Sequence, residues 1–102
     1  MIKNYMLNQN LSGGCIAHFV EYDGYLFIFD TEGYSIYHQG YCDRLGSEGF
    51  WDWWYDDRAD FIIMGRDFTH VINDSKFRNK SIDSLEGWCK TILRYLINRD
   101  IL

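Results

Sequence analysis

Two strand-like runs on either side of an Asp-Gly pair constrain the fold of this chain more than any other feature. Residues 15–22 (CIAHFVEY) and 25–30 (YLFIFD) are rich in β-branched and aromatic residues, and Asp23-Gly24 separates them. A type I′ hairpin turn needs positive φ at both central positions, which glycine adopts freely and aspartate more readily than most residues. The pattern therefore predicts a β-hairpin, and residues 34–38 (YSIYH) extend it to a three-stranded meander.

The C-terminal region has the periodicity of an amphipathic helix. Its apolar residues recur at three- and four-residue spacing, and Ser81 stands where a helix cap is expected. The predicted buried face comprises Ile82, Leu85, Trp88, Cys89, Ile92, Leu93 and Leu96. Gly87 lies inside this predicted helix, where glycine lowers helix stability by about 1 kcal/mol relative to alanine. Because a glycine without a side chain allows close packing, we expect a close contact between helix and strand there.

The remaining apolar runs complete a sheet. Residues 61–64 (FIIM) and 68–72 (FTHVI) are predicted to form two further strands, and residues 39–49 a glycine-containing loop. A chain of 102 residues has the usual size of one domain. We therefore expect a single α+β domain over residues 1–102, with an antiparallel sheet of about five strands and a C-terminal helix packed on one face.

Composition bears on the compartment. No stretch approaches the ~20 apolar residues of a membrane span, and the first ten residues, MIKNYMLNQN, lack the apolar run of a signal peptide. Three cysteines without framework spacing fit reduced thiols better than disulfides. These features favour a cytoplasmic location and no membrane partner.

Charge is unevenly distributed along the chain. Residues 1–65 hold three Lys or Arg against ten Asp or Glu, a net charge of −7, whereas residues 66–102 hold seven against five, a net charge of +2. Such asymmetry concerns partners and association rates rather than the fold. The acidic first part predicts a protein partner with a basic surface.

The segment 50–60 (FWDWWYDDRAD) concentrates both the charge and the aromatic residues, and we predict a short helix or helical turn there. In a helix, Asp52, Asp56 and Asp60 would share one face with about 6 Å between successive carboxylates, because the rise is ~1.5 Å per residue. Such a ridge imitates a phosphate backbone and would occupy a basic nucleic-acid groove. The predicted partner-binding residues are Trp51, Asp52, Trp53, Trp54, Tyr55, Asp56, Asp57 and Asp60, with Glu32 and Asp43 as an extension.

Two simpler interpretations of the charges stay open. The aspartates of residues 50–60 are also explained if they only keep an aromatic-rich segment solvated. Direct nucleic-acid binding would depend on the small basic patch Lys76, Arg78 and Lys80, and is less favoured.

Few residue sets are suited to catalysis or to metal binding. Cys15, His18, His38 and Cys42 form a legitimate zinc set, although Cys15 and His18 would point to opposite faces of a regular strand. Cysteine nucleophiles would pair Cys15, Cys42 or Cys89 with His18, His38 or His70, with Cys42 the most exposed thiol and Cys89 in the core. Common enzyme signatures are absent from the sequence, so we expect neither catalysis nor a cofactor.

In its short length, acidic aromatic segment 50–60 and lack of a catalytic set, the chain resembles the small inhibitors of phages and mobile elements, such as anti-CRISPR and anti-restriction proteins. The resemblance implies a stoichiometric inhibitor that covers the nucleic-acid groove of a nuclease or nucleoprotein complex, in the host cytoplasm if a phage encodes it. Immunity proteins and antitoxins, which neutralise basic nuclease toxins, share this profile. A zinc-stabilised module or Cys/His enzyme would draw on the cysteines and histidines instead, and an assembly protein would self-associate through exposed rings.

Overall fold

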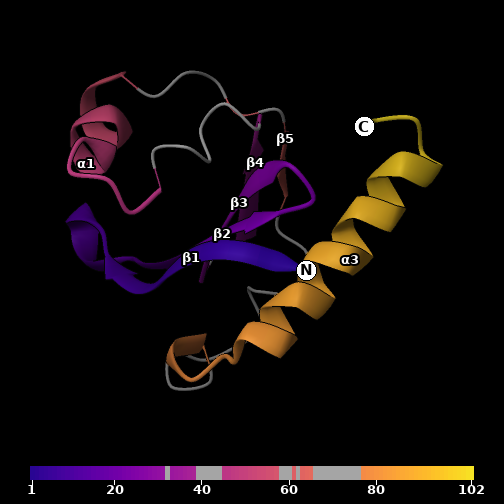
Figure 1. Ribbon diagram of the computed structural model, residues 1–102, viewed down its shortest axis with the longest axis horizontal. Helices are drawn as coiled ribbons and strands as arrows, with labels where there is room; N and C mark the ends of the chain where they lie inside the picture. Colours follow the sequence, from indigo (N-terminus) through magenta and orange to yellow (C-terminus); the bar gives the residue numbers. More distant parts are fainter. Residues whose placement is uncertain (32, 39–44, 58–60, 62, 66–76) are drawn as a thin grey trace.

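Each strand of the sheet pairs with the next strand along the chain, and every pairing is antiparallel (Figure 1). The computed structural model describes residues 1–31, 33–38, 45–57, 61, 63–65 and 77–102, with the backbone alone at residues 12, 56, 57, 63 and 64. The strands are β1 (Ile2–Asn10), β2 (Ile16–Tyr22), β3 (Tyr25–Asp30), β4 (Gly33–Tyr37) and β5 (Ile63–Gly65). The helical elements are η1 (Ser12–Gly14), α1 (Phe50–Asp52), η3 (Trp53–Asp57), which continues α1 as a π-helical turn, and α3 (Ile82–Asn98).

The predicted hairpin forms β2 and β3. Asp23 and Gly24 have φ of 50° and 80°, and Tyr22 pairs with Tyr25 directly beside them, as a two-residue type I′ turn requires. β4 then pairs with β3 and completes the predicted meander. The positive φ values confirm the physical reason for Asp-Gly at this turn.

The strands outside the meander differ from the expectation. β1 was not predicted, because its residues are mostly polar and it lies at the edge of the sheet with a bulge at Asn8, whose φ is 54°. β5 begins two residues later than the predicted run, and Phe61 is 44% exposed rather than part of a buried strand. Residues 68–72 lie outside the described residues. The predicted antiparallel sheet is confirmed, but its strands are not the predicted set, since β1 was not predicted and the strand predicted at residues 68–72 is not described.

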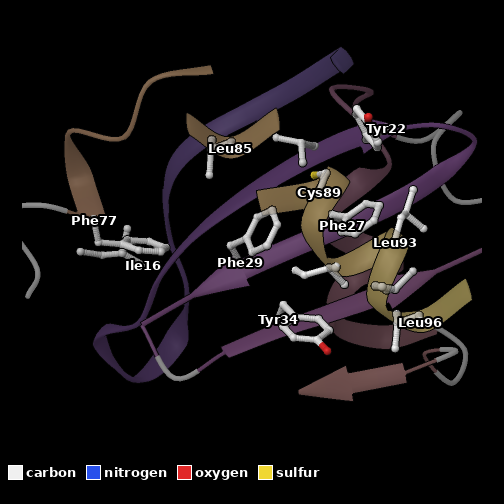
Figure 2. Packing of buried hydrophobic residues seen from close by; sticks show 13 residues of the cluster. Ile16, Tyr22, Phe27, Phe29, Tyr34, Phe77, Leu85, Cys89, Leu93 and Leu96 are labelled. Atoms are coloured by element: carbon white, nitrogen blue, oxygen red, sulfur yellow. The ribbon is translucent and has the colours of Figure 1, made fainter. Parts of the chain in front are cut away.

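The C-terminal helix α3 follows the prediction closely. The Ser81 hydroxyl accepts a hydrogen bond from the Ser84 backbone N–H at 3.2 Å and caps the first turn. Of the predicted face, Leu85, Cys89, Ile92, Leu93 and Leu96 are buried, whereas Ile82 and Trp88 are partly buried. Apart from Ile82, these residues pack on Val20, Phe27, Phe29, Tyr34 and Ile36 from the sheet, an arrangement that we call the α3-side core (Figure 2).

Gly87 does not mark a close contact. It is exposed, and a Cβ atom added there would meet nothing within 4 Å. The expected approach of helix and strand is therefore corrected, because Gly87 lies on the outer side of α3. No helix in the described ranges has both the length and the apolar character of a membrane span.

The other face of the sheet is covered as well, by the segment α1–η3 (Figure 1). Side chains of β2 and β3 alternate between the faces, so Ala17, Phe19, Leu26 and Ile28 point away from α3 and form a second cluster, the α1-side core. Burial on both faces explains why β2 and β3 are almost continuously apolar. The fold is α+β with a helical element on each side of the sheet.

Candidate functional site

The inner side of α1–η3 is part of the core. Phe50, Trp53 and Trp54 are 0%, 2% and 7% exposed, and they occupy helical positions i, i+3 and i+4 on the side that faces the sheet. The Phe19 ring lies edge-to-face against Phe50 and Trp54, with centroids 5.2 and 5.1 Å apart, and Tyr37 packs against Trp53 at 6.1 Å. Trp53 and Trp54 were expected on a partner-binding surface; that expectation is corrected, because their rings are enclosed by the sheet.

The outer side of α1–η3 carries the predicted site residues that reach solvent. Asp52 is exposed, Tyr55 is 52% exposed, and Trp51 is half-buried. The Trp51 ring stacks on the Tyr55 ring at 6.0 Å and also contacts Phe19 edge-to-face at 5.8 Å, so it joins the outer surface to the α1-side core. Trp51, Asp52 and Tyr55 form what we call the outer α1 face.

The structure describes only part of the predicted aspartate ridge. The helix predicted for residues 50–60 is present over residues 50–57 as α1 and η3, so Asp52 and the backbone of Asp56 and Asp57 belong to it. Asp60, Glu32 and Asp43 lie outside the described residues. The alignment of Asp52 with Asp56 and Asp60 therefore stays a prediction.

The charge asymmetry of the sequence becomes an asymmetry between the two faces of the sheet. Residues 45–57, which cover one face, contain Glu48, Asp52, Asp56 and Asp57 and no Lys or Arg, a net charge of −4. Residues 77–102, which include α3 on the other face, contain five Lys or Arg and three Asp or Glu, a net charge of +2. We call residues 45–57 the acidic layer and residues 77–102 the basic layer, although α3 by itself has two acidic and two basic residues. The sheet lies between α1 and α3, which belong to these two layers (Figure 1).

His18, a member of the predicted zinc set, is buried in the core, and both of its ring nitrogens form hydrogen bonds. Its Nδ1 accepts a hydrogen bond from the Asn8 backbone N–H at 3.0 Å, so its Nε2 carries the proton and donates to the Phe77 carbonyl oxygen at 2.7 Å. The ring is fully buried and stacks on the Phe77 ring at 4.2 Å. Burial lowers the pKa of His18, against a smaller opposite effect of the hydrogen bond to Phe77. Neither ring nitrogen is available to a metal ion.

Of the other members of the candidate chemical sets, only Cys15, His38 and Cys89 are described. Cys15 is half-buried just before β2, His38 is exposed just after β4, and Cys42 and His70 lie outside the described residues. Within the ranges that the structure describes, no three His, Cys, Asp or Glu side chains are placed to hold a metal ion. Burial raises the pKa of the Cys89 thiol, so the reactive thiolate is disfavoured in the α3-side core.

The small basic patch before α3 is only partly described. Arg78 is exposed, and the Lys80 ammonium lies over the Trp88 ring at 4.8 Å from its centroid. Lys76 lies outside the described residues. Lys80 thus contributes to packing around the start of α3 as well as to the surface charge.

Sequence reasoning missed the inner role of Trp53 and Trp54, although two signals pointed to it. Phe50, Trp53 and Trp54 have the same spacing that identified the buried face of α3. The uninterrupted apolar run of residues 25–29 also indicated a strand buried on both faces, which requires a second covering element. Segment 50–57 is rich in aromatic residues and was not assigned to the sheet or to the C-terminal helix, so it was the candidate for this second covering element.

The chain matches no protein-family model, no curated protein and no solved structure. Its function is therefore inferred from its own residues and geometry.

Proposed function

We propose that this protein is a stoichiometric inhibitor of the anti-CRISPR type, which binds a nucleic-acid-processing enzyme through the acidic layer of residues 45–57. The outer α1 face contacts basic side chains of the enzyme's nucleic-acid groove. Binding there excludes the nucleic acid from the groove.

The observation that carries the proposal is the placement of the acidic layer on one face of the sheet, opposite the basic layer. Four acidic residues and no basic residue lie within residues 45–57. An acidic surface of this kind accelerates encounter with a basic groove and favours one orientation, since residues 77–102, with their net charge of +2, lie on the side away from the groove. A protein that blocks a groove must bind with its blocking surface toward that groove, and the charge distribution favours this orientation.

The packing of α1–η3 adds rigidity to this surface. Phe50, Trp53 and Trp54 are buried in the α1-side core. Their packing fixes the backbone that carries the exposed side chains of Asp52 and Tyr55. A preorganised contact surface loses less conformational entropy on binding than a flexible loop. The half-exposed Tyr55 ring and its stacked neighbour Trp51 supply the aromatic contacts typical of interface hot spots.

The test uses a charge-neutral variant of the acidic layer. Glu48→Gln/Asp52→Asn removes two exposed negative charges beside and within α1. Immobilised full-length protein is used to capture partners from the native host, and the affinity for the captured enzyme is measured at about 50 and about 200 mM salt. We expect the wild type to capture a nuclease in a 1:1 complex, and the variant to bind it at least about tenfold more weakly with a smaller salt dependence.

The matched control removes the same charge from the other layer. Asp83→Asn/Asp100→Asn neutralises two exposed aspartates within or just after α3, and its affinity should equal that of the wild type. Excess duplex nucleic acid should displace the wild-type protein from the enzyme. Equal weakening by both double variants, or a captured enzyme that still cleaves nucleic acid when saturated, would contradict the proposal.

An immunity protein would use the same contact surface against a different target. If the captured nuclease is a toxin encoded beside this chain, the protein neutralises that toxin; if it belongs to a host defence complex, the protein is an anti-defence inhibitor. The double variants test the surface in either case.

A further inference from the structure

A pocket lies on the basic side of the molecule, remote from the outer α1 face. It has a volume of about 430 Å³ and opens between the β2–β3 turn and the second half of α3. Tyr22 and Asp23 line it from the turn, whereas Leu93 and Ile97 form an apolar wall one helical turn apart. It is a shallow pocket, widely open to solvent, and its volume falls within the range of small-molecule sites, which is about 300–1,000 Å³.

The Tyr22 hydroxyl is a polar group in this pocket without a partner. Tyr22 as a whole is only 8% exposed, but its hydroxyl is open to solvent in the pocket and makes no hydrogen bond within the described part of the chain. Burial is the largest cause that raises the pKa of this hydroxyl; the negative charges of Glu86 and Asp23 raise it further, while the Arg94 guanidinium lowers it. Figure 2 shows Tyr22 and Leu93 on the same side of the α3-side core, away from Ile16 and Phe77. A protonated phenol in such a place is a hydrogen-bond donor for a ligand.

Two cations complete the pocket. Lys90 and Arg94 lie four residues apart on α3 and both line the pocket. Neither forms an ion pair with a carboxylate among the residues that the structure describes. With Asp23 at the rim, the lining carries a net charge of +1, which matches a ligand with one negative charge.

We propose that this pocket binds a small organic monocarboxylate with an apolar body. The carboxylate receives charge-assisted hydrogen bonds from Arg94 and Lys90 and a hydrogen bond from the Tyr22 hydroxyl, while the apolar body packs on Leu93 and Ile97. Asn98, which also lines the pocket, offers its amide to the same ligand. The site is independent of the inhibitor function, because it lies on the other face of the sheet.

The proposal is tested with sodium phenylacetate as the probe. Backbone amide signals of the ¹⁵N-labelled full-length protein are followed by NMR during titration in a Bis-Tris buffer at low salt. We expect saturable shifts at residues 22–24 and 90–98, with a dissociation constant on the order of 1 mM, as is usual for a fragment of this size. Phenylacetamide, which has the same shape without the charge, should bind at least about fivefold more weakly.

Variants then assign the contacts. Arg94→Gln should weaken phenylacetate binding at least about fivefold, because a charge-assisted hydrogen bond is lost, and Tyr22→Phe about threefold. Arg78→Gln removes an exposed cation outside the pocket and should leave the affinity unchanged. Absence of saturation at about 10 mM phenylacetate, equal binding of phenylacetamide, or equal weakening by Arg78→Gln would overturn the proposal.

Discussion

His18 shows how a single residue can join three separate segments. It belongs to β2, accepts a hydrogen bond from the bulge of β1 at Asn8, and donates one to the carbonyl of Phe77 before α3. The bond from Asn8 requires an unprotonated Nδ1, since a proton there would face the Asn8 N–H, whereas the bond to Phe77 persists in the protonated ring. The attachment of the edge strand β1 at Asn8 is thus tied to the protonation state of one side chain.

The free energy of unfolding should therefore depend on pH through His18. Its folded pKa lies below the ordinary value of 6.5, so the unfolded chain binds the proton more readily. The stabilisation should be complete above about pH 6.5 and decline as the pH falls from there towards the lowered folded pKa. Urea unfolding at about pH 7.5 and about pH 5.0 measures this decline. It should shrink in His18→Gln and persist in His38→Gln, which changes an exposed histidine; equal declines in both variants would refute the role.

Gly65 and Gly87 differ in the space available for a Cβ atom, so substitution by alanine should change the free energy of unfolding in opposite directions. A Cβ atom at Gly65 would lie 2.5 Å from Tyr34 Cζ, and the Tyr34 ring is buried and cannot easily move away, whereas Gly87 has open space within α3. Gly65→Ala should lower the free energy of unfolding by about 1–3 kcal/mol through overpacking. Gly87→Ala should raise it by about 0.5–1 kcal/mol through helix propensity. Chemical denaturation compares them, and an unchanged midpoint for Gly65→Ala would exclude the close approach of Tyr34.

At the scale of the element, α1–η3 is a short helical segment stabilised by what it buries. A helix of eight residues is marginal in isolation, so its order depends on the contacts of Phe50, Trp53 and Trp54 with the sheet. Trp53→Ala should cost about 3–5 kcal/mol, whereas Tyr55→Ala, which truncates a half-exposed ring, should cost less than about 1 kcal/mol. Denaturant midpoints followed by circular dichroism distinguish the two. Similar losses would mean that the outer ring is as important to the fold as the inner one.

At the scale of the whole molecule, the two cores share the same central strands. β2 and β3 contribute to both, so the acidic layer and the basic layer are held on a common scaffold. The proposed protein-binding face and the proposed carboxylate pocket lie on opposite sides of this scaffold. Both can therefore be occupied at once, and loss of one site by mutation should leave the other intact.

The local elements of this fold follow from the sequence because their causes are local. The Asp23-Gly24 turn depends on two φ angles, the start of α3 on the Ser81 hydroxyl, and the helix face on a spacing of three and four residues. Each of these can be recognised without knowledge of distant residues.

Tertiary structure decided what the rings of residues 50–55 do. The sequence predicted a helix there and its acidity, but not that Trp53 and Trp54 would close the second face of the sheet while Asp52 and Tyr55 stay outside. The same is true of polar β1, which pairs with the free edge of β2, and of the pocket, whose walls come from distant parts of the sequence. Aromatic residues serve equally well in a core or at an interface. Their role here depends on the face of the sheet that α3 leaves uncovered, and only the tertiary structure shows that face.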